Sequence, residues 1–114
     1  MKILRTLFLS VLLLVLFSTV SCAGTTRIGD VLADKAKYEG KEISIKGTVG
    51  ESAWLVTVKK GTYQLGDDSG TIWIITTQPP PAQGQSISTK GKVQSAFTIL
   101  DRSYGTVLVE TKRE

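Results

Sequence analysis

The chain has 114 residues, no histidine, one cysteine and a formal net charge of +4 at pH 7. The absence of histidine removes the commonest general base and metal ligand of proteins, and a single cysteine cannot form a disulfide within the chain. No spacing of the remaining residues suggests a catalytic pair. We therefore expect a protein without enzymatic activity, metal or cofactor.

The first residues have the pattern of an export signal. Lys2 and Arg5 precede an apolar run over residues 7–17, and small residues follow it. The run is shorter than the ~20 residues that a membrane-spanning helix needs, although counting over residues 3–20 comes close. An uncleaved N-terminal anchor is therefore the alternative to a cleaved signal peptide.

Cys22 stands where the apolar run gives way to small residues. Its surroundings resemble the lipobox of bacterial lipoproteins, in which the cysteine is lipidated and becomes the mature N-terminus. Ser21 and Ala23 fit the small positions beside it, whereas Thr19 departs from the pattern, because a leucine is usual there. The resemblance implies a lipoprotein anchored in the cell envelope, at the outer membrane or in the periplasm if the cell has two membranes. Cleavage after Ala23 would instead release a soluble secreted protein.

We expect a signal peptide over residues 1–21, a lipid-anchored linker over 22–27 and one domain over 28–114. Removing residues 1–21 would leave 93 residues, the size of a single domain, with 12 basic side chains against 10 acidic ones. This excess does not by itself supply the concentrated basic patch that binding to phosphates usually needs.

Residues 25–37 predict a short helix, because apolar side chains recur there at helical spacing, at Ile28, Val31, Leu32 and Ala36. Thr26 or Asp30 is expected to cap its start, and Gly40 to end it. We expect the apolar stripe to pack on the rest of the domain. The alternative is a helix that binds a partner.

Residues 41–50 alternate between apolar and polar side chains, which is typical of a half-buried strand. Gly47 in its interior suggests a bulge or a sharp bend. Residues 51–61 lack a clear period, and we interpret them as a long loop or a short extension at a sheet edge.

The segment from Tyr63 to Ile75 predicts a β-hairpin. Two runs rich in β-branched and aromatic residues flank Asp67, Asp68, Ser69 and Gly70, which are side chains that tight turns select. Alternation directs one set of side chains to the core (Tyr63, Leu65, Ile72 and Ile74) and another outward (Thr62, Gln64, Trp73 and Ile75). The two aspartates have no further acidic residue at calcium-ligand spacing, so we interpret them as part of the turn.

The second half of the chain predicts two more strands. Residues 76–85 contain three consecutive prolines and form an extended connection, with a proline-rich ligand as the alternative. Residues 85–93 alternate as a strand, and residues 105–110 form the last strand. We expect residues 95–104 to be a loop with an apolar tip, and the charged residues 111–114 to be frayed.

Three segments carry a resemblance to a known family. Residues 38–49, 66–74 and 81–93 resemble the first strand, the second hairpin and the fourth strand of an OB-fold domain of the tRNA-anticodon-binding-like type. The resemblance implies an all-β fold, a small five-stranded OB-fold barrel with one short N-terminal helix. One departure is the proline run, which replaces the helix that many OB-folds carry between strands three and four. The N-terminal helix is expected to close that end of the barrel.

The resemblance also implies a binding face on strands two and three and the loops beside them. Mapped onto this chain, the implied ligand-binding residues are Lys46, Thr48, Trp54, Gln64, Trp73, Ile75, Lys90, Phe97 and Tyr104. Aromatic side chains offer bases a surface to stack on, worth about 1–3 kcal/mol per base, and lysines follow phosphates. The alternative is that Trp73 is covered by another segment or by a partner.

Fold resemblance alone makes binding of single-stranded nucleic acid the first hypothesis for function. The second is an envelope module that binds a protein, peptide or glycan with the same face, and a third is a spacer without a ligand. Exposure of Trp73 with Lys46 and Lys90 on one continuous face would favour the first. A smooth apolar patch around Trp73, Ile75 and Phe97 would favour the second.

Overall fold

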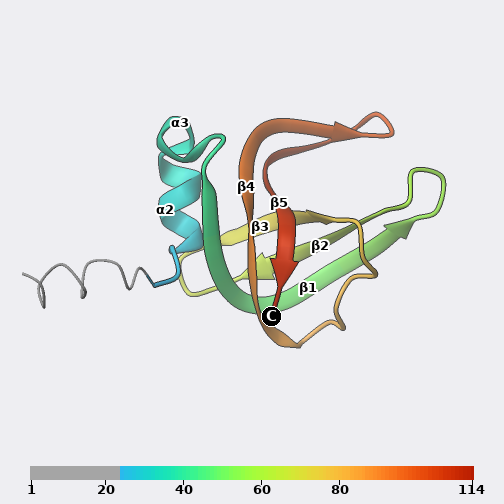
Figure 1. Cartoon of the computed structure of the whole chain (residues 1–114), viewed down its shortest axis with the longest axis horizontal. Coiled ribbons are helices and arrows are strands. Elements are labelled where there is room, and N and C mark those ends of the chain that lie inside the picture. Colours follow the sequence, from blue (N-terminus) through green and yellow to red (C-terminus); the bar gives the residue numbers. More distant parts are fainter. Residues whose placement is uncertain (1–23) are drawn as a thin grey trace, which may run out of the picture.

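A computed structural model describes residues 24–114, and the expected signal peptide and Cys22 lie outside the described residues. Two short helices precede five strands (Figure 1): α2 Ile28–Ala33, α3 Lys35–Tyr38, β1 Glu42–Leu55, β2 Lys60–Gly66, β3 Thr71–Thr76, β4 Ser86–Ile99 and β5 Arg102–Arg113. In this part of the chain, neither helix has the length and apolar character needed to cross a membrane.

The five strands close into a barrel in the order β1-β2-β3-β5-β4. β3 and β5 pair in parallel, with Trp73 opposite Val107 and Ile75 opposite Val109, and the other neighbours pair antiparallel. Closure leaves the body of the sheet without a free edge. The predicted class, a small all-β OB-like barrel, is confirmed.

The core fills the barrel and extends under α2. The four side chains predicted to point inward from the β2–β3 hairpin are all buried: Tyr63, Leu65, Ile72 and Ile74. Ile45 and Val49 of β1 join them because alternation directs every second residue of a strand inward. Ile28 and Val31 of α2 complete the cluster, so the apolar stripe of the helix packs on the rest of the domain as expected, at the end of the barrel where the β2–β3 turn lies.

The helical segment differs from the prediction in two ways. Instead of one helix over residues 25–37, the chain breaks at Asp34, whose φ of −135° lies outside the helical region and whose carboxylate accepts a hydrogen bond from the N–H of Lys37. The expected cap by Thr26 or Asp30 is wrong. Arg27 occupies the N-cap position of α2 and provides no side-chain hydrogen bond.

The first N–H groups of α2 are satisfied by the β2–β3 turn. The N–H of Ile28 donates to Asp67 Oδ2 (3.0 Å), and the N–H of Gly29 donates to Ser69 Oγ (2.8 Å). Asp67 also organises its own turn, because its Oδ1 accepts hydrogen bonds from the N–H groups of Ser69 and Gly70. Two segments about 40 residues apart are thereby joined.

The β1–β2 and β4–β5 hairpins are longer than predicted. Residues 51–61 are largely strand, because β1 continues to Leu55 and β2 starts at Lys60. The expectation of a loop over 95–104 is wrong, because β4 runs to Ile99 and β5 begins at Arg102. The tail is not frayed either, since β5 continues to Arg113. Both hairpins project from the side of the barrel opposite α2 (Figure 1).

Gly47 allows a close approach between strands, and the bulge expected there lies elsewhere. The pairing of β1 with β2 shifts between Val49 and Ser52. A Cβ atom added at Gly47 would lie 2.3 Å from the carbonyl oxygen of Gly66, so no side chain fits. Gly91 of β4 is similar, with the carbonyl oxygen of Val109 at 2.2 Å from an added Cβ.

Candidate functional site

Two aromatic side chains meet on the outer face of β3 and β5. The rings of Trp73 and Tyr104 have centroids 5.2 Å apart and planes inclined at 76°, which is an edge-to-face contact. Such pairs stabilise by about 0.5–1.5 kcal/mol beyond their buried area. Both side chains remain half-buried rather than covered.

Cations lie against these rings. The guanidinium carbon of Arg102 is 5.4 Å from the centroid of the Trp73 ring and 4.9 Å from that of Tyr104. On the neighbouring part of the face, the ammonium of Lys60 lies 5.9 Å from the centroid of the Phe97 ring. All three distances fall within the range of cation–π attraction. We call these five residues, Lys60, Trp73, Phe97, Arg102 and Tyr104, the ring site.

The ring site rests on a second apolar cluster outside the barrel. Ile75, Ile99 and Val107 are buried there, and Leu55 and Val58 from the end of the β1–β2 hairpin pack against them. The β4–β5 hairpin therefore folds over the outer face of β3. This explains why Ile75 is buried although its position in the strand points outward, as the alternation predicted.

The structure brings four of the predicted site residues together: Trp73, Ile75, Phe97 and Tyr104 all belong to this second cluster. Gln64 stands opposite Trp73 in the β2–β3 pairing, and its side-chain oxygen accepts a hydrogen bond from the N–H of Glu51 (3.3 Å). Trp54 lies near the end of β1, opposite Gly61, with 40% of its surface exposed.

The remaining predicted residues lie elsewhere. Lys46 and Thr48 line an open groove of about 470 Å³ on the β1–β4 side of the barrel, together with Ser86, Ser88, Asp67 and Glu114. Lys90 is exposed on β4 and pairs with Glu42 (Nζ–Oε1 3.4 Å). The predicted site is thus divided between two surfaces, and the continuous face of Trp73 with Lys46 and Lys90 that was expected to favour nucleic acid is not formed. The cations that lie beside the aromatic rings are Arg102 and Lys60 instead.

Sequence reasoning missed Arg102 and Lys60. Arg102 and Tyr104 are two residues apart, the spacing that places side chains on one face of a strand. That signal was present in the sequence, but it has meaning only if the segment is a strand, and residues 95–104 were expected to be a loop. Lys60 lay likewise in a segment without a clear period.

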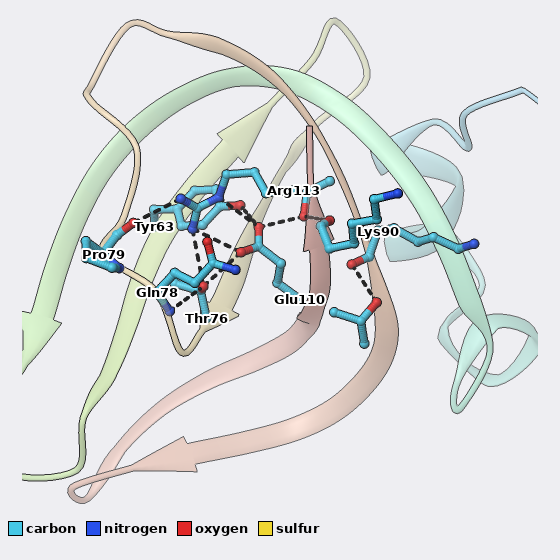
Figure 2. A network of polar contacts seen from close by, with 10 residues as sticks. Tyr63, Thr76, Gln78, Pro79, Lys90, Glu110 and Arg113 are labelled. Atoms are coloured by element: carbon cyan, nitrogen blue, oxygen red, sulfur yellow. Dashed lines mark hydrogen bonds and ion pairs between the residues drawn. The ribbon is translucent and has the colours of Figure 1, made fainter.

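A second concentration of titratable groups lies around Glu110, inside the barrel wall (Figure 2). Its carboxylate accepts hydrogen bonds from the hydroxyl groups of Tyr63, Thr76 and Thr89, and from both Nε (3.2 Å) and Nη2 (3.0 Å) of Arg113. Arg113 also donates to the carbonyl oxygen of Pro79 (2.9 Å). The Glu110 side chain is only 2% exposed.

Protonation in this cluster follows from its contacts. Burial acts to raise the pKa of Glu110, but the hydrogen bonds from Thr89, Tyr63, Arg113 and Thr76 outweigh it, and the pKa lies below its ordinary value. Burial and the hydrogen bond to Glu110 raise the pKa of Tyr63. Tyr63 therefore stays protonated and donates to an ionised Glu110.

The Glu110 cluster is structural. It joins side chains from four strands, β2, β3, β4 and β5. The polar atoms of these side chains form hydrogen bonds with one another. Within residues 24–114, every buried side-chain nitrogen or oxygen has a hydrogen-bond partner. A group that is already fully bonded has no free position for a ligand. The ring site is therefore the better candidate for binding.

Comparisons with known proteins identify solved structures with a similar fold, but no family with a similar sequence. No protein-family model matches the chain, and no curated protein matches its sequence. Among solved structures, asparaginyl-tRNA synthetase from Pyrococcus horikoshii complexed with asparaginyl-adenylate is similar, with a TM-score of 0.63, 16% identity, and coverage of 80% of this chain and 22% of that one.

A second structure of asparaginyl-tRNA synthetase from Pyrococcus horikoshii matches with a TM-score of 0.55 and 17% identity, over 68% of this chain and 20% of that one. The chain thus spans about a fifth of the length of the synthetase. At this identity the likeness concerns fold alone. The chain has an OB-like fold shared with one part of a tRNA synthetase.

Proposed function

We propose that this protein is an exported, lipid-anchored OB-fold module without enzymatic activity, and that its ring site binds single-stranded nucleic acid. The observation that carries the proposal is the ring site itself. Trp73, Tyr104 and Arg102 are in contact with one another, and Phe97, which lies beside Lys60, packs against the same apolar cluster.

This combination suits an unpaired polynucleotide. Every base has a flat face that stacks on aromatic side chains with about 1–3 kcal/mol per base, while phosphates attract lysine and arginine. In a duplex the bases are already stacked on one another and do not reach a flat protein surface. Arg102 and Lys60 lie close to the rings, within reach of the phosphates of a stacked strand.

The proposed anchor is compatible with this site. The N–H of Thr26 donates to the carbonyl oxygen of Ser44 (2.7 Å), so only a few residues separate Cys22 from the body of the domain. Lipidation at Cys22 would hold the α2 end close to the membrane. The hairpins project from the opposite side (Figure 1), so they would point away from the bilayer.

The shared fold supports the proposal at a coarser level. Asparaginyl-tRNA synthetase, by its name, acts on a nucleic acid, and part of it has the same architecture as this chain. Folds of this class use the corresponding face to bind oligonucleotides or oligosaccharides.

A protein partner in the envelope is the second candidate. Two large apolar side chains are exposed near the ends of the projecting hairpins, Val56 with 75% and Leu100 with 58% of their surface accessible. Exposed aliphatic side chains contribute little to nucleic-acid binding and are more typical of contacts between proteins.

Tryptophan fluorescence separates the candidates. The chain from Ala23 onward contains every described helix and strand, and a Trp54→Phe change leaves Trp73 as its single tryptophan. We expect a short oligothymidylate to quench Trp73, with an affinity that decreases steeply as salt increases. A Trp73→Leu variant, followed with a labelled oligonucleotide, should lose most of the binding. No quenching at low salt would reject nucleic acid and leave the protein partner.

A further inference from the structure

We infer that the outer half of the β4–β5 hairpin, residues 96–105, is a displaceable lid on Trp73, and that it carries Phe97, Arg102 and Tyr104 of the ring site with it when it opens. A nucleic-acid base then takes the place on the Trp73 ring that Arg102 occupies when the lid is closed. This inference rests on the proposed function for its ligand. The lid itself follows from the backbone, the contacts and the register of the hairpin.

Backbone strain is concentrated in this hairpin. Four non-glycine residues in the described part of the chain have a positive φ, and three of them are here: Ala96 (55°), Leu100 (49°) and Asp101 (65°). The side chains of alanine and leucine disfavour this left-handed region, and that of aspartate does so less. Leu100 and Asp101 together form the turn, where glycine, asparagine and aspartate are preferred. The hairpin is therefore less stable in this form than a hairpin with favourable turn residues.

A bend across both strands marks a hinge. Ala96 on β4 and Gly105 on β5 (φ 69°) both have positive φ, and the residue after Ala96, Phe97, pairs directly with Gly105. The register of the two strands shifts between Gln94 and Phe97. In Figure 1 both ribbons turn at this end of the barrel and run outward together. Rotation at this level would move the outer half as a unit.

The contacts that hold the lid down are apolar and cation–π contacts. Ile99 is buried against Ile75 and Val107, Phe97 and Tyr104 pack beside it, and Arg102 lies over the rings. Within residues 24–114, no side-chain hydrogen bond or ion pair joins residues 96–104 to the barrel, in contrast to the fully bonded Glu110 cluster. Contacts of this kind can separate without leaving a buried polar group unpaired.

The closed lid and a bound base compete for the same ring surface, because Arg102 covers it when the lid is closed. Its guanidinium lies 4.9 Å from the centre of one ring and 5.4 Å from the other, on ring surface that a stacked base would need. When a base replaces it, the guanidinium becomes free to pair with a phosphate. The apparent affinity is then the intrinsic affinity reduced by the fraction of molecules whose lid is open.

Amide hydrogen exchange of the unmodified chain from Ala23 onward tests the lid without a variant or a ligand. We expect the amides of residues 97–104 to exchange at least tenfold faster than those of the β2–β3 hairpin, which serves as the internal control because both of its strands pair within the barrel. Equal protection of the two hairpins would overturn the lid.

An Ile99→Ala change then links the lid to binding. In the Trp54→Phe background it should increase quenching of Trp73 by acrylamide, and it should increase the affinity for oligothymidylate several-fold, because more molecules are open. Thr98→Ala changes an exposed neighbour on the same strand and is expected to alter neither quantity.

The outcomes separate the two proposals. Fast exchange without oligonucleotide binding by any variant would keep the lid and reject the proposed function. Oligonucleotide binding that is equal in the wild type and in Ile99→Ala, with equal protection of both hairpins, would keep the function and reject the lid.

Discussion

The guanidinium of Arg102, at the start of β5, lies 5.4 Å from the ring centre of Trp73, in the middle of β3. The two residues meet because β3 and β5 are parallel neighbours, and because the β4–β5 hairpin folds back over the outer face of β3. A cation is thereby placed on an aromatic surface that faces outward. The proposed function depends on the ring surface that this contact covers.

Arg102→Gln is expected to reduce the salt dependence of oligonucleotide binding. Each phosphate neutralised on a single strand contributes about 0.7 to the slope of log K against log salt, so loss of Arg102 should lower the slope by about that amount. Titrations at several salt concentrations measure it. Lys35→Gln on α3 removes an equal charge far from the ring site and should leave the slope nearly unchanged. An unchanged slope in Arg102→Gln would show that Arg102 does not contact phosphate.

Glu110→Gln is expected to destabilise the barrel by about 2 kcal/mol. Breaking a buried ion pair costs about 3–5 kcal/mol, and we expect less because the Arg113 side chain is 17% exposed. Urea denaturation provides the free energy of unfolding. The matched control is Glu42→Gln, which removes an exposed ion pair with Lys90 and should cost about 0–1 kcal/mol. Equal effects of the two changes would contradict the structural role of Glu110.

The free energy of unfolding of the domain should decrease at acid pH. Burial acts to raise the pKa of Asp67, but hydrogen bonds from the side chain of Ser69 and from the N–H groups of Ile28, Ser69 and Gly70 lower it to about 2, and the pKa of Glu110 is also lowered. Both groups have ordinary values of about 4 in the unfolded chain. The stability they contribute is complete above that pH and is lost as the pH falls through their lower folded values.

Urea midpoints measured from pH 6 down to pH 2 test this dependence. The wild type should lose stability below about pH 4, and Glu110→Gln should show a shallower decrease because one of the two shifted carboxyl groups is gone. Parallel curves for the two proteins would contradict the assignment of a lowered pKa to Glu110.

Removing the distant cap of α2 should destabilise the helix and its contact with the barrel. Asp67→Ala deletes the acceptor for the N–H of Ile28, and a lost cap typically costs about 1 kcal/mol. Asp68→Ala in the same turn is the control, since its side chain is 87% exposed and makes only a surface ion pair with Arg27. Denaturation curves that do not distinguish the two variants would show that Asp67 is not a cap.

The parts of the fold that could be predicted are those whose pattern is local. The β2–β3 hairpin has turn residues at Asp67 and Gly70 and clean alternation on both sides, so its position and its inward faces followed from the sequence. The residues that cap α2 could not be predicted, because the acceptors for the N–H groups of Ile28 and Gly29 lie in a turn far along the chain.

The ring site was predicted only in part, for a reason visible in the β4–β5 turn. Leu100 and Asp101 both adopt positive φ, and leucine is not among the residues that sequence rules expect in such a turn. The turn therefore carries no signal, and the strands on both sides were interpreted as a loop. Trp73, Phe97 and Tyr104 were identified by residue type, whereas Arg102 becomes a candidate only when the strand is known.

The most direct test of the central claim is a proton–nitrogen correlation spectrum of the chain from Ala23 onward, recorded at low salt with and without a short oligothymidylate. The chain has two tryptophans, so their two indole N–H signals provide a comparison within one sample. We predict that the Trp73 signal moves together with the Arg102 side-chain signal, while the Trp54 signal stays in place. Unchanged signals for Trp73 and Arg102 at saturating oligonucleotide would contradict the claim that the ring site binds single-stranded nucleic acid.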